Sequence, residues 1–270
     1  MDLGLKDKAC VVTGASRGIG RETAKLLCAE GAGVLLVARS AEALADAAEE
    51  CGRAGAQAQG RAASLTLDVT DPDAGERICA EATERFGRLD VLVNNAGTAK
   101  RRDMEEVPDE DWQAAWEINV MAPMRAMRAA VPGMAERGWG RIVNVSSSAG
   151  KRPSPQTSEY SVAKAAELSL SRVFADSYAE AGVLVNAICP GPTKSEMWTE
   201  PGGLADQAGE RAGTASHDEV FESVGASRPV GRLAEVEEIA SAIVFLCSER
   251  ASYVAGAAWS VDGGSVQVII

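Results

Sequence analysis

Short apolar runs alternate with longer amphipathic stretches through the first two-thirds of the chain. The apolar runs are rich in Val, Ile and Leu, as is typical of strands buried on both faces of a parallel sheet. They span residues 9–13, 33–38, 64–69, 90–94, 141–146 and 183–188. The stretches between them carry Ala, Leu and charged residues at helical spacing, and they span residues 18–30, 41–55, 72–86, 109–137 and 158–181.

This alternation predicts a doubly wound α/β fold. Strand–helix–strand units make right-handed crossovers, which place helices on both faces of a mostly parallel sheet. A last helix is expected near residues 235–248, and GAAWSVDGG (256–264) predicts a seventh strand. Because no linker, repeat or low-complexity tract interrupts the pattern, we expect residues 1–270 to form a single domain with a seven-stranded Rossmann fold.

The segment at about 192–230 departs from this regular pattern. It is polar, it is broken by Gly and Pro, and it includes Trp198 and Phe221. A long insertion of this kind in a compact domain is usually a lid or a binding segment. We therefore expect residues 192–230 to bind the substrate.

Composition excludes several classes of partner. The net charge of −12 argues against a nucleic-acid or anionic-membrane partner, since either would need a basic surface. The six cysteines are scattered without a C-x-x-C pair, which is typical of a reducing compartment and argues against disulfides or a metal site. No signal-peptide pattern and no apolar run of ~18 residues is present. We expect a soluble, cytoplasmic protein without a metal.

The stretch TGASRGIG (13–20) allows two interpretations. Its G-x-S-x-G spacing matches the nucleophile elbow of an α/β-hydrolase, with Ser16 as nucleophile. However, the chain before Thr13 is too short for the earlier strand that carries the hydrolase oxyanion donor, and the single histidine, His217, lies in the irregular segment. The stretch follows a predicted strand and opens a predicted helix, which is the context of a glycine turn that binds a dinucleotide.

Two arginines near this turn favour NADP(H) over NAD(H). The second predicted strand ends in LLVARS, with the small Ala38 where an NAD-binding protein typically carries an acidic residue for the ribose hydroxyls. Arg39 follows it, and Arg17 lies within the glycine turn. Two guanidiniums can bind the dianionic 2′-phosphate through charge-assisted hydrogen bonds.

Tyr160 and Lys164 form the first element of a reactive constellation. They lie four residues apart, and hence on one face of a helix. A free tyrosine titrates near ~10, and a neighbouring ammonium favours the phenolate needed for acid–base chemistry near neutral pH. A run of serines that includes Ser147 follows another strand, at the rim where open α/β sheets bind ligands. Asn119 within the helix 109–137 is unfavourable by propensity, so we expect it to have a partner.

Taken in order, these motifs resemble the short-chain dehydrogenase/reductase family, single-domain branch, over nearly the whole chain. The matching stretches are TGASRGIG, LDV (67–69), NNAG (94–97), Asn119, NVSSSAG, Tyr160-x-x-x-Lys164, NAICPG (186–191) and VDGG (261–264). The resemblance implies that Tyr160 is the acid in reduction and the base in oxidation. It implies that Lys164 assists Tyr160 and holds the nicotinamide ribose, that Ser147 binds the substrate oxygen, and that Asn119 holds a water of a proton relay.

The resemblance also implies a set of cofactor contacts. The glycine turn would bind the phosphates, Arg39 the 2′-phosphate, Asp68 and Val69 the adenine, and the NNAG loop the adenosine ribose. The end of the NAICPG strand and the residues after it would seat the nicotinamide carboxamide. The full set is Gly14, Ser16, Arg17, Gly18, Ile19, Gly20, Arg39, Asp68, Val69, Asn95, Ala96, Gly97, Tyr160, Lys164, Pro190, Gly191, Thr193 and Ser195.

The expected reaction is the interconversion of a ketone or 3-oxoacyl group and a secondary alcohol, with the substrate left open among carrier-bound, CoA-bound and free ketones. Members resembling 3-oxoacyl-[acyl-carrier-protein] reductase usually have a basic residue where Ala181 stands. An acidic carrier would want a basic docking surface, and the residues that could supply one are Lys100, Arg101, Arg102, Lys151 and Arg152. Met197, Trp198 and Phe221 suggest an apolar substrate body.

Two further expectations follow from the resemblance. A non-catalytic NADP(H)-binding sensor of the same fold is the alternative function, and the complete set of four catalytic residues argues against it. Family members are usually homotetramers, so we expect a homotetramer that packs helices 109–137 and 158–181 against a partner. The apolar tail VQVII (266–270) is a second expected interface element, because exposed apolar patches tend to be covered.

Overall fold

The computed structural model describes residues 2–214 and 216–267, and it contains the expected parallel sheet. The strand order is β3-β2-β1-β4-β5-β6-β9, and every neighbouring pair is parallel. The strands are β1 (Ala9–Thr13), β2 (Gly33–Ala38), β3 (Arg61–Thr66), β4 (Val91–Asn94), β5 (Gly140–Val145), β6 (Val183–Pro190) and β9 (Ala258–Val261). The order reverses direction between β1 and β4, which is the place where doubly wound sheets open a crevice for ligands.

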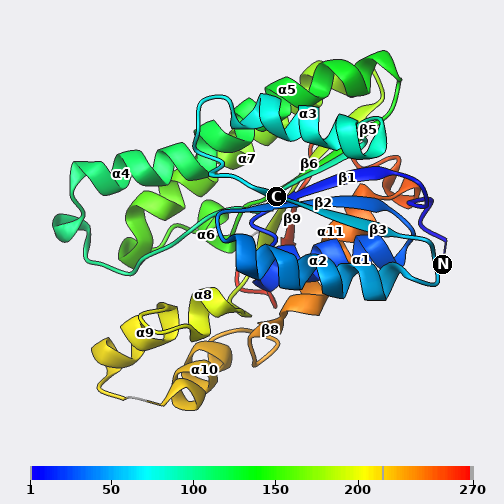
Figure 1. Ribbon diagram of the computed structural model, residues 1–270. Helices are drawn as coiled ribbons and strands as arrows, with labels where there is room; N and C mark the ends of the chain where they lie inside the picture. The colour runs from blue at the N-terminus through cyan, green and yellow to red at the C-terminus, as the bar shows by residue number, and fades with distance from the viewer. Residues whose placement is uncertain (1, 215, 268–270) are drawn as a thin grey trace.

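Helices cover both faces of the sheet (Figure 1). One face carries α1 (Gly18–Ala29), α2 (Ala41–Gly55) and α11 (Val236–Cys247), and the other carries α3 (Ala74–Phe86), α4 (Asp109–Trp116), α5 (Ala122–Glu136) and α7 (Ser158–Tyr178). The shorter helices of the main body are η1 (Met104–Glu106), α6 (Ser148–Lys151), η3 (Pro155–Thr157) and η4 (Glu249–Ala251). The doubly wound α/β fold predicted from the alternating pattern is thereby confirmed.

Each face of the sheet has its own hydrophobic core, because successive strand residues point to opposite faces. Val12 and Leu36 belong to the core under α1 and α11, whereas Val11 and Leu35 belong to the core under α3 and α5. All four side chains are fully buried. This is why the strand sequences are continuously apolar rather than alternating.

Two elements differ from the sequence prediction. The third strand covers residues 61–66 instead of 64–69, and its side chains are partly exposed because β3 is an edge strand. The predicted helix 109–137 is divided into α4 and α5 by η2 (Glu117–Met121), a single π-helical turn. A π turn inserts one extra residue into a helix, and such turns are frequent at functional sites.

The segment 192–230 is more ordered than an irregular loop. It contains α8 (Glu196–Thr199), α9 (Leu204–Ala212) and α10 (His217–Ala226), which lie together below the sheet in Figure 1. Their apolar side chains form a small core together with Leu233, which precedes β8 (Ala234–Glu235), and the helix residues in it are Trp198, Leu204, Ala205 and Val220. His217 is half-exposed, and its Nε2 lies 2.6 Å from Asp206 Oδ1.

A two-stranded pair closes the base of this segment. β7 (Thr193–Lys194) pairs with β8 (Ala234–Glu235) in parallel, with Thr193 opposite Ala234 and Lys194 opposite Glu235. Lys194 Nζ also lies 2.8 Å from a carboxylate oxygen of Glu235. The segment therefore leaves the main body and returns to it at the same place.

Across residues 2–214 and 216–267, no helix has both the length and the apolar character that crossing a membrane requires. All six cysteines have free thiols, and five of them are buried. Burial raises the pKa of the Cys247 thiol to about 12 and that of Cys189 to about 11. These side chains therefore pack as small apolar groups at neutral pH.

Candidate active site

The ends of β1 and β4 are held together by hydrogen bonds around Thr13. Thr13 Oγ1 accepts from the backbone N–H groups of Asn95 (3.0 Å) and Ala96 (3.1 Å), and Asn95 Nδ2 donates to Thr13 O (3.0 Å). Gly14 follows with a φ of +64°, and a Cβ there would lie 2.9 Å from the Ala96 Cα. The glycine is required at this position on both counts, backbone conformation and space.

A cavity of about 510 Å³ opens above this turn at the carboxyl ends of the strands. It extends from the glycine turn past the end of β2 to the NNAG loop. The predicted cofactor residues that line it are Gly14, Ser16, Arg17, Gly18, Ile19, Arg39, Asp68, Val69, Asn95, Ala96, Gly97 and Ser195. Gly20 does not line the cavity. A Cβ there would come within 2.4 Å of Asn95 Nδ2, so the glycine is needed for the close packing of α1 against Asn95.

Each of the two arginines at this cavity has a carboxylate neighbour. Arg39 is 79% exposed, and its Nη1 lies 4.0 Å from Asp68 Oδ2. Hydrogen bonds from the backbone and hydroxyl of Thr70 lower the pKa of Asp68, and Arg39 lowers it further. Arg17 pairs with Glu200 from the segment 192–230. Both guanidiniums therefore lie at the rim of the cavity, where an incoming phosphate can exchange with the carboxylates.

A second and larger cavity, of about 800 Å³, contains the predicted reactive side chains. Ser147, Tyr160 and Lys164 line it, together with Pro190, Gly191, Thr193 and Ser195. Residues of the segment 192–230 form its outer wall, including Met197, Trp198 and Val224. The two cavities adjoin, because both are lined by Ile19, Asn95, Gly97, Ser195 and Met197.

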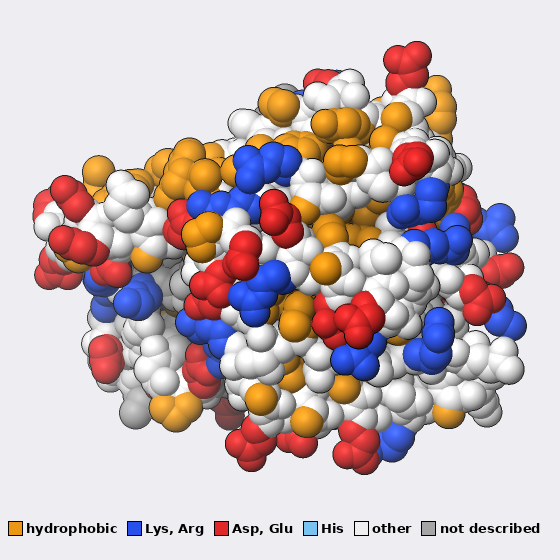
Figure 2. All heavy atoms as spheres, turned by 45° about the horizontal axis from the view of Figure 1, so that its top comes forward, with side chains coloured by type: hydrophobic (Ala, Val, Ile, Leu, Met, Phe, Trp, Pro, Cys, Tyr) orange, Lys and Arg blue, Asp and Glu red, His pale blue; other side chains and the backbone are white. Residues whose placement is uncertain are grey.

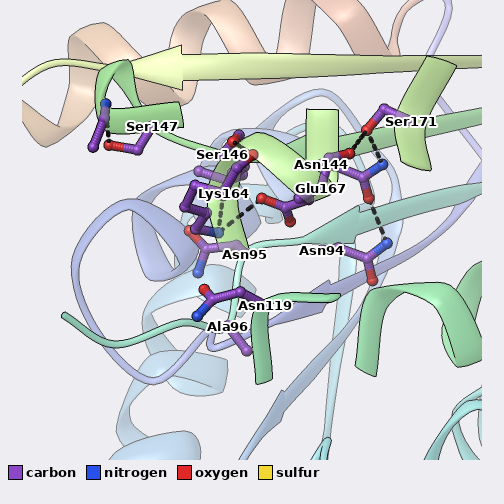
Figure 3. Close-up of polar contacts among 12 residues, drawn as sticks. Asn94, Asn95, Ala96, Asn119, Asn144, Ser146, Ser147, Lys164, Glu167 and Ser171 are labelled. Carbon is purple, nitrogen blue, oxygen red and sulfur yellow. Dashed lines mark hydrogen bonds and ion pairs between the residues drawn. The ribbon is translucent and has the colours of Figure 1, made fainter. Parts of the chain in front are cut away.

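Lys164 is held inside the protein by two oxygen atoms. Its side chain is 3% exposed, and Nζ donates to Val145 O (2.8 Å) and to Glu167 Oε2 (2.9 Å). Figure 3 shows Glu167 reaching toward the ammonium from the next turn of the same helix. The Glu167 carboxylate is itself 2% exposed, so the two groups form a buried ion pair beside Tyr160.

The pair changes the proton affinity of both partners. Burial alone would lower the pKa of Lys164, but the charges of Glu167 and Tyr160 and the Glu167 hydrogen bond raise it above its ordinary value. Burial raises the pKa of Glu167, and Lys164 offsets only part of that rise. The ammonium form of Lys164 is therefore maintained at neutral pH despite its burial.

A chain of amide and hydroxyl groups fixes α7 against the ends of the strands (Figure 3). Asn94 Nδ2 donates to Asn144 Oδ1 (2.7 Å), and Asn144 Nδ2 donates to Ser171 Oγ (2.7 Å). Ser146 Oγ donates to the main-chain oxygen of Lys164 (3.0 Å). These bonds join α7 to the ends of β4 and β5. They therefore fix the position of Tyr160 and Lys164, which lie on α7, relative to the sheet.

Asn119 lies in the π-helical turn, and it is fully buried. Its Nδ2 donates to Ala115 O (2.9 Å), which is the partner expected from its unfavourable place in a helix. Its Oδ1 has no hydrogen-bond partner within the part of the chain that the structure describes. A Cβ added to Gly97 would lie 3.1 Å from that oxygen and 3.7 Å from Lys164 Nζ, so Asn119 and Lys164 converge beside Gly97.

Comparison with known proteins agrees with this arrangement. Residues 14–266 match the sequence profile of a family described as enoyl-(acyl carrier protein) reductase. The chain is 38% identical to an uncharacterized oxidoreductase, YvrD, of Bacillus subtilis, over 99% of each chain. The chain is a short-chain dehydrogenase/reductase.

Other members of the family are similar over the same length. This short-chain dehydrogenase/reductase is 38% identical to a cis-4-hydroxycyclohexanecarboxylate dehydrogenase of Sinomonas cyclohexanicum, over 97% of this chain and 98% of that protein. A crystal structure of L-sorbose reductase from Gluconobacter frateurii, complexed with NADPH and L-sorbose, superposes with a TM-score of 0.92. The two sequences are 36% identical, and each chain is covered in full. The family resemblance inferred from the motifs is confirmed.

Glu167 is the residue of this site that motif reasoning missed. The motif Tyr-x-x-x-Lys ends at Lys164, and Glu167 follows it three residues later in AKAAELSL. An acidic residue at this spacing lies on the lysine's own face of the helix. That spacing indicates an ion pair with Lys164. Exposed ion pairs on helices have the same spacing, however, and only burial in the folded protein distinguishes a buried pair from an exposed one.

Proposed function

We propose that this short-chain dehydrogenase/reductase is an NADP(H)-dependent oxidoreductase that interconverts a ketone and a secondary alcohol by hydride transfer. The observation that carries the proposal is the common cavity of Ser147, Tyr160 and Lys164, which adjoins the cavity above the glycine turn. The similar structure that holds NADPH and L-sorbose supports the same reaction class.

The residues around the smaller cavity fit NADP(H). Gly14 and Gly18 adopt positive φ values in the turn at the start of α1 and add no side chain there, where helix amides attract phosphate. Arg39 and Arg17 would hold the 2′-phosphate, Asp68 and Val69 the adenine, and Asn95 to Gly97 its ribose. Pro190, Gly191, Thr193 and Ser195 would hold the nicotinamide carboxamide. When bound, the cofactor supplies a hydride for the carbonyl carbon or accepts one from the alcohol.

The protein's own groups position the substrate and move the proton. The Ser147 hydroxyl would donate a hydrogen bond to the substrate oxygen, and Tyr160 would give its proton to that oxygen in reduction and take it back in oxidation. The ammonium of Lys164 favours the ionised tyrosine. The unpartnered Oδ1 of Asn119 would hold a water near Lys164, and that water would return the proton to Tyr160.

A small ketone suits the surface of the site better than an acidic carrier protein. Lys100 and Arg102 both pair with Asp111, and Lys151 Nζ donates to the main-chain oxygen of Ala258 and to Ser260 Oγ. These three basic side chains are therefore engaged within the chain, and the other two candidates, Arg101 and Arg152, line the substrate cavity. The segment 192–230, within a single domain of residues 1–270, would serve as the lid that binds the substrate.

The reaction class is tested directly by turnover. NADPH oxidation is followed by absorbance with a panel of ketones, and NADP⁺ reduction with the matching alcohols. Turnover in at least one direction is expected. Tight binding of NADPH without turnover of any ketone or alcohol would contradict the proposal and favour a non-catalytic sensor.

The 2′-phosphate assignment predicts a change of cofactor preference in Arg39→Asp. A hydrogen bond to a charged group contributes about 1.5–3 kcal/mol, so kcat/KM for NADPH should fall by about ten- to a hundredfold relative to kcat/KM for NADH. Arg53→Asp, which removes an exposed arginine on α2, is the matched control. An unchanged NADPH/NADH ratio in Arg39→Asp would exclude this role.

An apolar surface on α4 and α7 supports the expected homotetramer. Trp116, Val162 and Val173 are 43–61% exposed although they are large and hydrophobic. Hydrophobic side chains gather toward the upper part of Figure 2, on the side where α3, α5 and α7 lie in Figure 1. A second copy of this chain, packed on the α4–α7 surface, would cover these residues.

Val173→Glu should therefore weaken assembly. An unpaired carboxylate buried in the interface costs several kcal/mol, which lowers the association constant by at least about a hundredfold. Analytical ultracentrifugation should show smaller species at concentrations where the wild type is tetrameric. Ala45→Glu, on the exposed face of α2, should sediment like the wild type. A tetramer of unchanged stability in Val173→Glu would place the interface elsewhere.

A further inference from the structure

Three arginines line the substrate cavity, and no Asp or Glu among the described residues lines it. Arg101 follows β4, Arg152 follows α6, and Arg228 follows α10, so three separate segments bring a guanidinium to one space. We propose that the substrate is a ketone, or the corresponding alcohol, that carries a carboxylate or phosphate group, and that Arg101, Arg152 and Arg228 bind this anionic group. The inference rests on the proposed function and names its substrate class.

The absence of a counter-ion at these arginines is not a consequence of composition. The chain has 39 acidic and 27 basic residues other than histidine, so carboxylates are in excess. Arginines elsewhere use them, as Arg172 does with Asp176 and Arg232 with Glu238. Within residues 2–214 and 216–267, by contrast, none of the three cavity arginines has an ion-pair partner.

Neutral oxygens hold the three side chains in place. Arg101 Nη2 donates to Gln156 Oε1, Arg228 Nη1 donates to Val224 O, and Arg152 Nη1 donates to Ser265 O (3.2 Å). The buried Nε groups of Arg101 and Arg228 have no hydrogen-bond partner among the described residues. The side chains are therefore oriented, but no carboxylate of the described residues neutralises their charge, and donors remain without a described partner.

The arginines also repel one another. Burial lowers the pKa of Arg101, and the charges of Arg211 and Arg228 lower it further. Burial lowers the pKa of Arg228 as well, with a further contribution from Arg152. Like charges held together in a partly desolvated space are unfavourable, and an anion between them would remove the repulsion. A planar guanidinium binds carboxylate or phosphate oxygens through paired, charge-assisted hydrogen bonds.

The phosphates of the cofactor do not account for these residues. The cavity above the glycine turn is lined by Arg17 and Arg39, and it is not lined by Arg101, Arg152 or Arg228. Arg228 belongs to the segment 192–230 and lines the same cavity as Tyr160 and Ser147. An anionic group of the substrate bound there would fix the orientation of its carbonyl toward Tyr160 and Ser147.

The test compares ketones that differ only in charge. Straight-chain oxo acids with five to eight carbons are assayed beside their methyl esters, and dihydroxyacetone phosphate beside dihydroxyacetone. The anionic member of at least one pair is expected to have a kcat/KM at least tenfold higher. Arg228→Gln should reduce that ratio by tenfold or more, mainly through KM of the anion. Arg77→Gln, an exposed arginine on α3, should leave the ratio unchanged.

A binding measurement separates this inference from the proposed reaction. Calorimetric titration of the NADP⁺-loaded protein with each oxo acid and with dihydroxyacetone phosphate should show binding of at least one of them, which Arg228→Gln and Arg152→Gln each weaken. Arg152 is exposed, so its variant reports on binding even if the Arg228 variant fails to fold. Equal kcat/KM for the anionic and the neutral member of every pair would overturn the inference and leave the proposed function standing. If no ketone were reduced but the anion bound through these arginines, the proposed function would fail and the anion site would stand.

Discussion

Tyr160→Phe should lose at least a hundredfold, and up to about ten-thousandfold, in kcat, because positioned proton transfer contributes a factor of this size. The hydroxyl is removed, while the ring that packs beside Lys164 is kept. Binding of NADPH, measured by its fluorescence, should be nearly unchanged. The loss should therefore appear in kcat rather than in cofactor affinity.

A second tyrosine on the same helix provides the control. Tyr178 stacks on Phe174 at the far end of α7, with ring centroids 6.0 Å apart. Tyr178→Phe removes the same atom from the same helix and should retain wild-type kcat. If Tyr160→Phe turned over any substrate as fast as the wild type, Tyr160 would not be the proton donor.

Glu167→Leu should lower the free energy of unfolding by about 3–5 kcal/mol, because breaking a buried ion pair leaves an uncompensated buried charge. Lys164 would keep its burial and its bond to Val145 O but lose the carboxylate that maintains its charge. Urea unfolding measures the loss. Glu49→Leu, which breaks the exposed pair with Arg53, should have a far smaller effect.

The loss of unfolding free energy in Glu167→Leu should become smaller as the pH rises. In the wild type the pKa of Lys164 is raised, so its contribution to stability is present below the unfolded value near ~10.4 and is lost as pH rises through the folded value. In Glu167→Leu the contributions of Glu167 are lost and burial, the largest influence, outweighs that of Tyr160, so the folded pKa of Lys164 is expected to fall below the unfolded one. Between these two values the unfolded chain binds more protons, so the variant gains stability as pH rises. The deficit relative to wild type should be larger at pH 6 than at pH 9.

The pH profile of activity should also reflect the lower pKa of Lys164 in Glu167→Leu. Once Lys164 loses its proton at a lower pH, activity of Glu167→Leu should decline at a lower pH than wild-type activity does. Glu167→Gln, whose amide oxygen can still accept from Lys164, should be less affected in both measurements. A Glu167→Leu variant with wild-type stability and an unchanged pH profile would show that the pair has no such role.

The sequence predicted the order of elements well because burial on both faces makes strands visible as unbroken apolar runs. The edge strand β3 was misplaced by three residues for the opposite reason. Half of its side chains face solvent, so Arg61 and Ser64 are tolerated in the strand, while the buried Leu67 lies just past its end. The hydrophobic pattern of a strand reflects how much of it is buried, and an edge strand is buried too little to show a clear pattern.

Some residues of the site could likewise be predicted from the sequence, and others could not. Motifs with fixed spacing predicted Ser147, Tyr160, Lys164 and the glycine turn, and the structure brings these residues to two adjoining cavities. The π turn at Asn119 and the buried partner Glu167 depend on tertiary packing, which spacing alone does not encode. The arginines of the substrate cavity come from three distant segments. Their proximity, and the lack of a counter-ion in the described residues, are properties of the folded chain.

The closed base of the segment 192–230 has a consequence for how such a protein can diversify. β7 near its start pairs with β8 just past its end, and its helices pack with Leu233 on a small core. If the chain between β7 and β8 is lengthened, shortened or replaced, the pairing of these strands still fixes the two points at which it joins the main body. The entropic cost of a longer loop also grows only slowly with its length. Chimeras cut at residues 193–194 and 234–235 should therefore exchange substrate preference as a unit, while the glycine turn and the loops after β2 and β4 keep their part of the cofactor cavity.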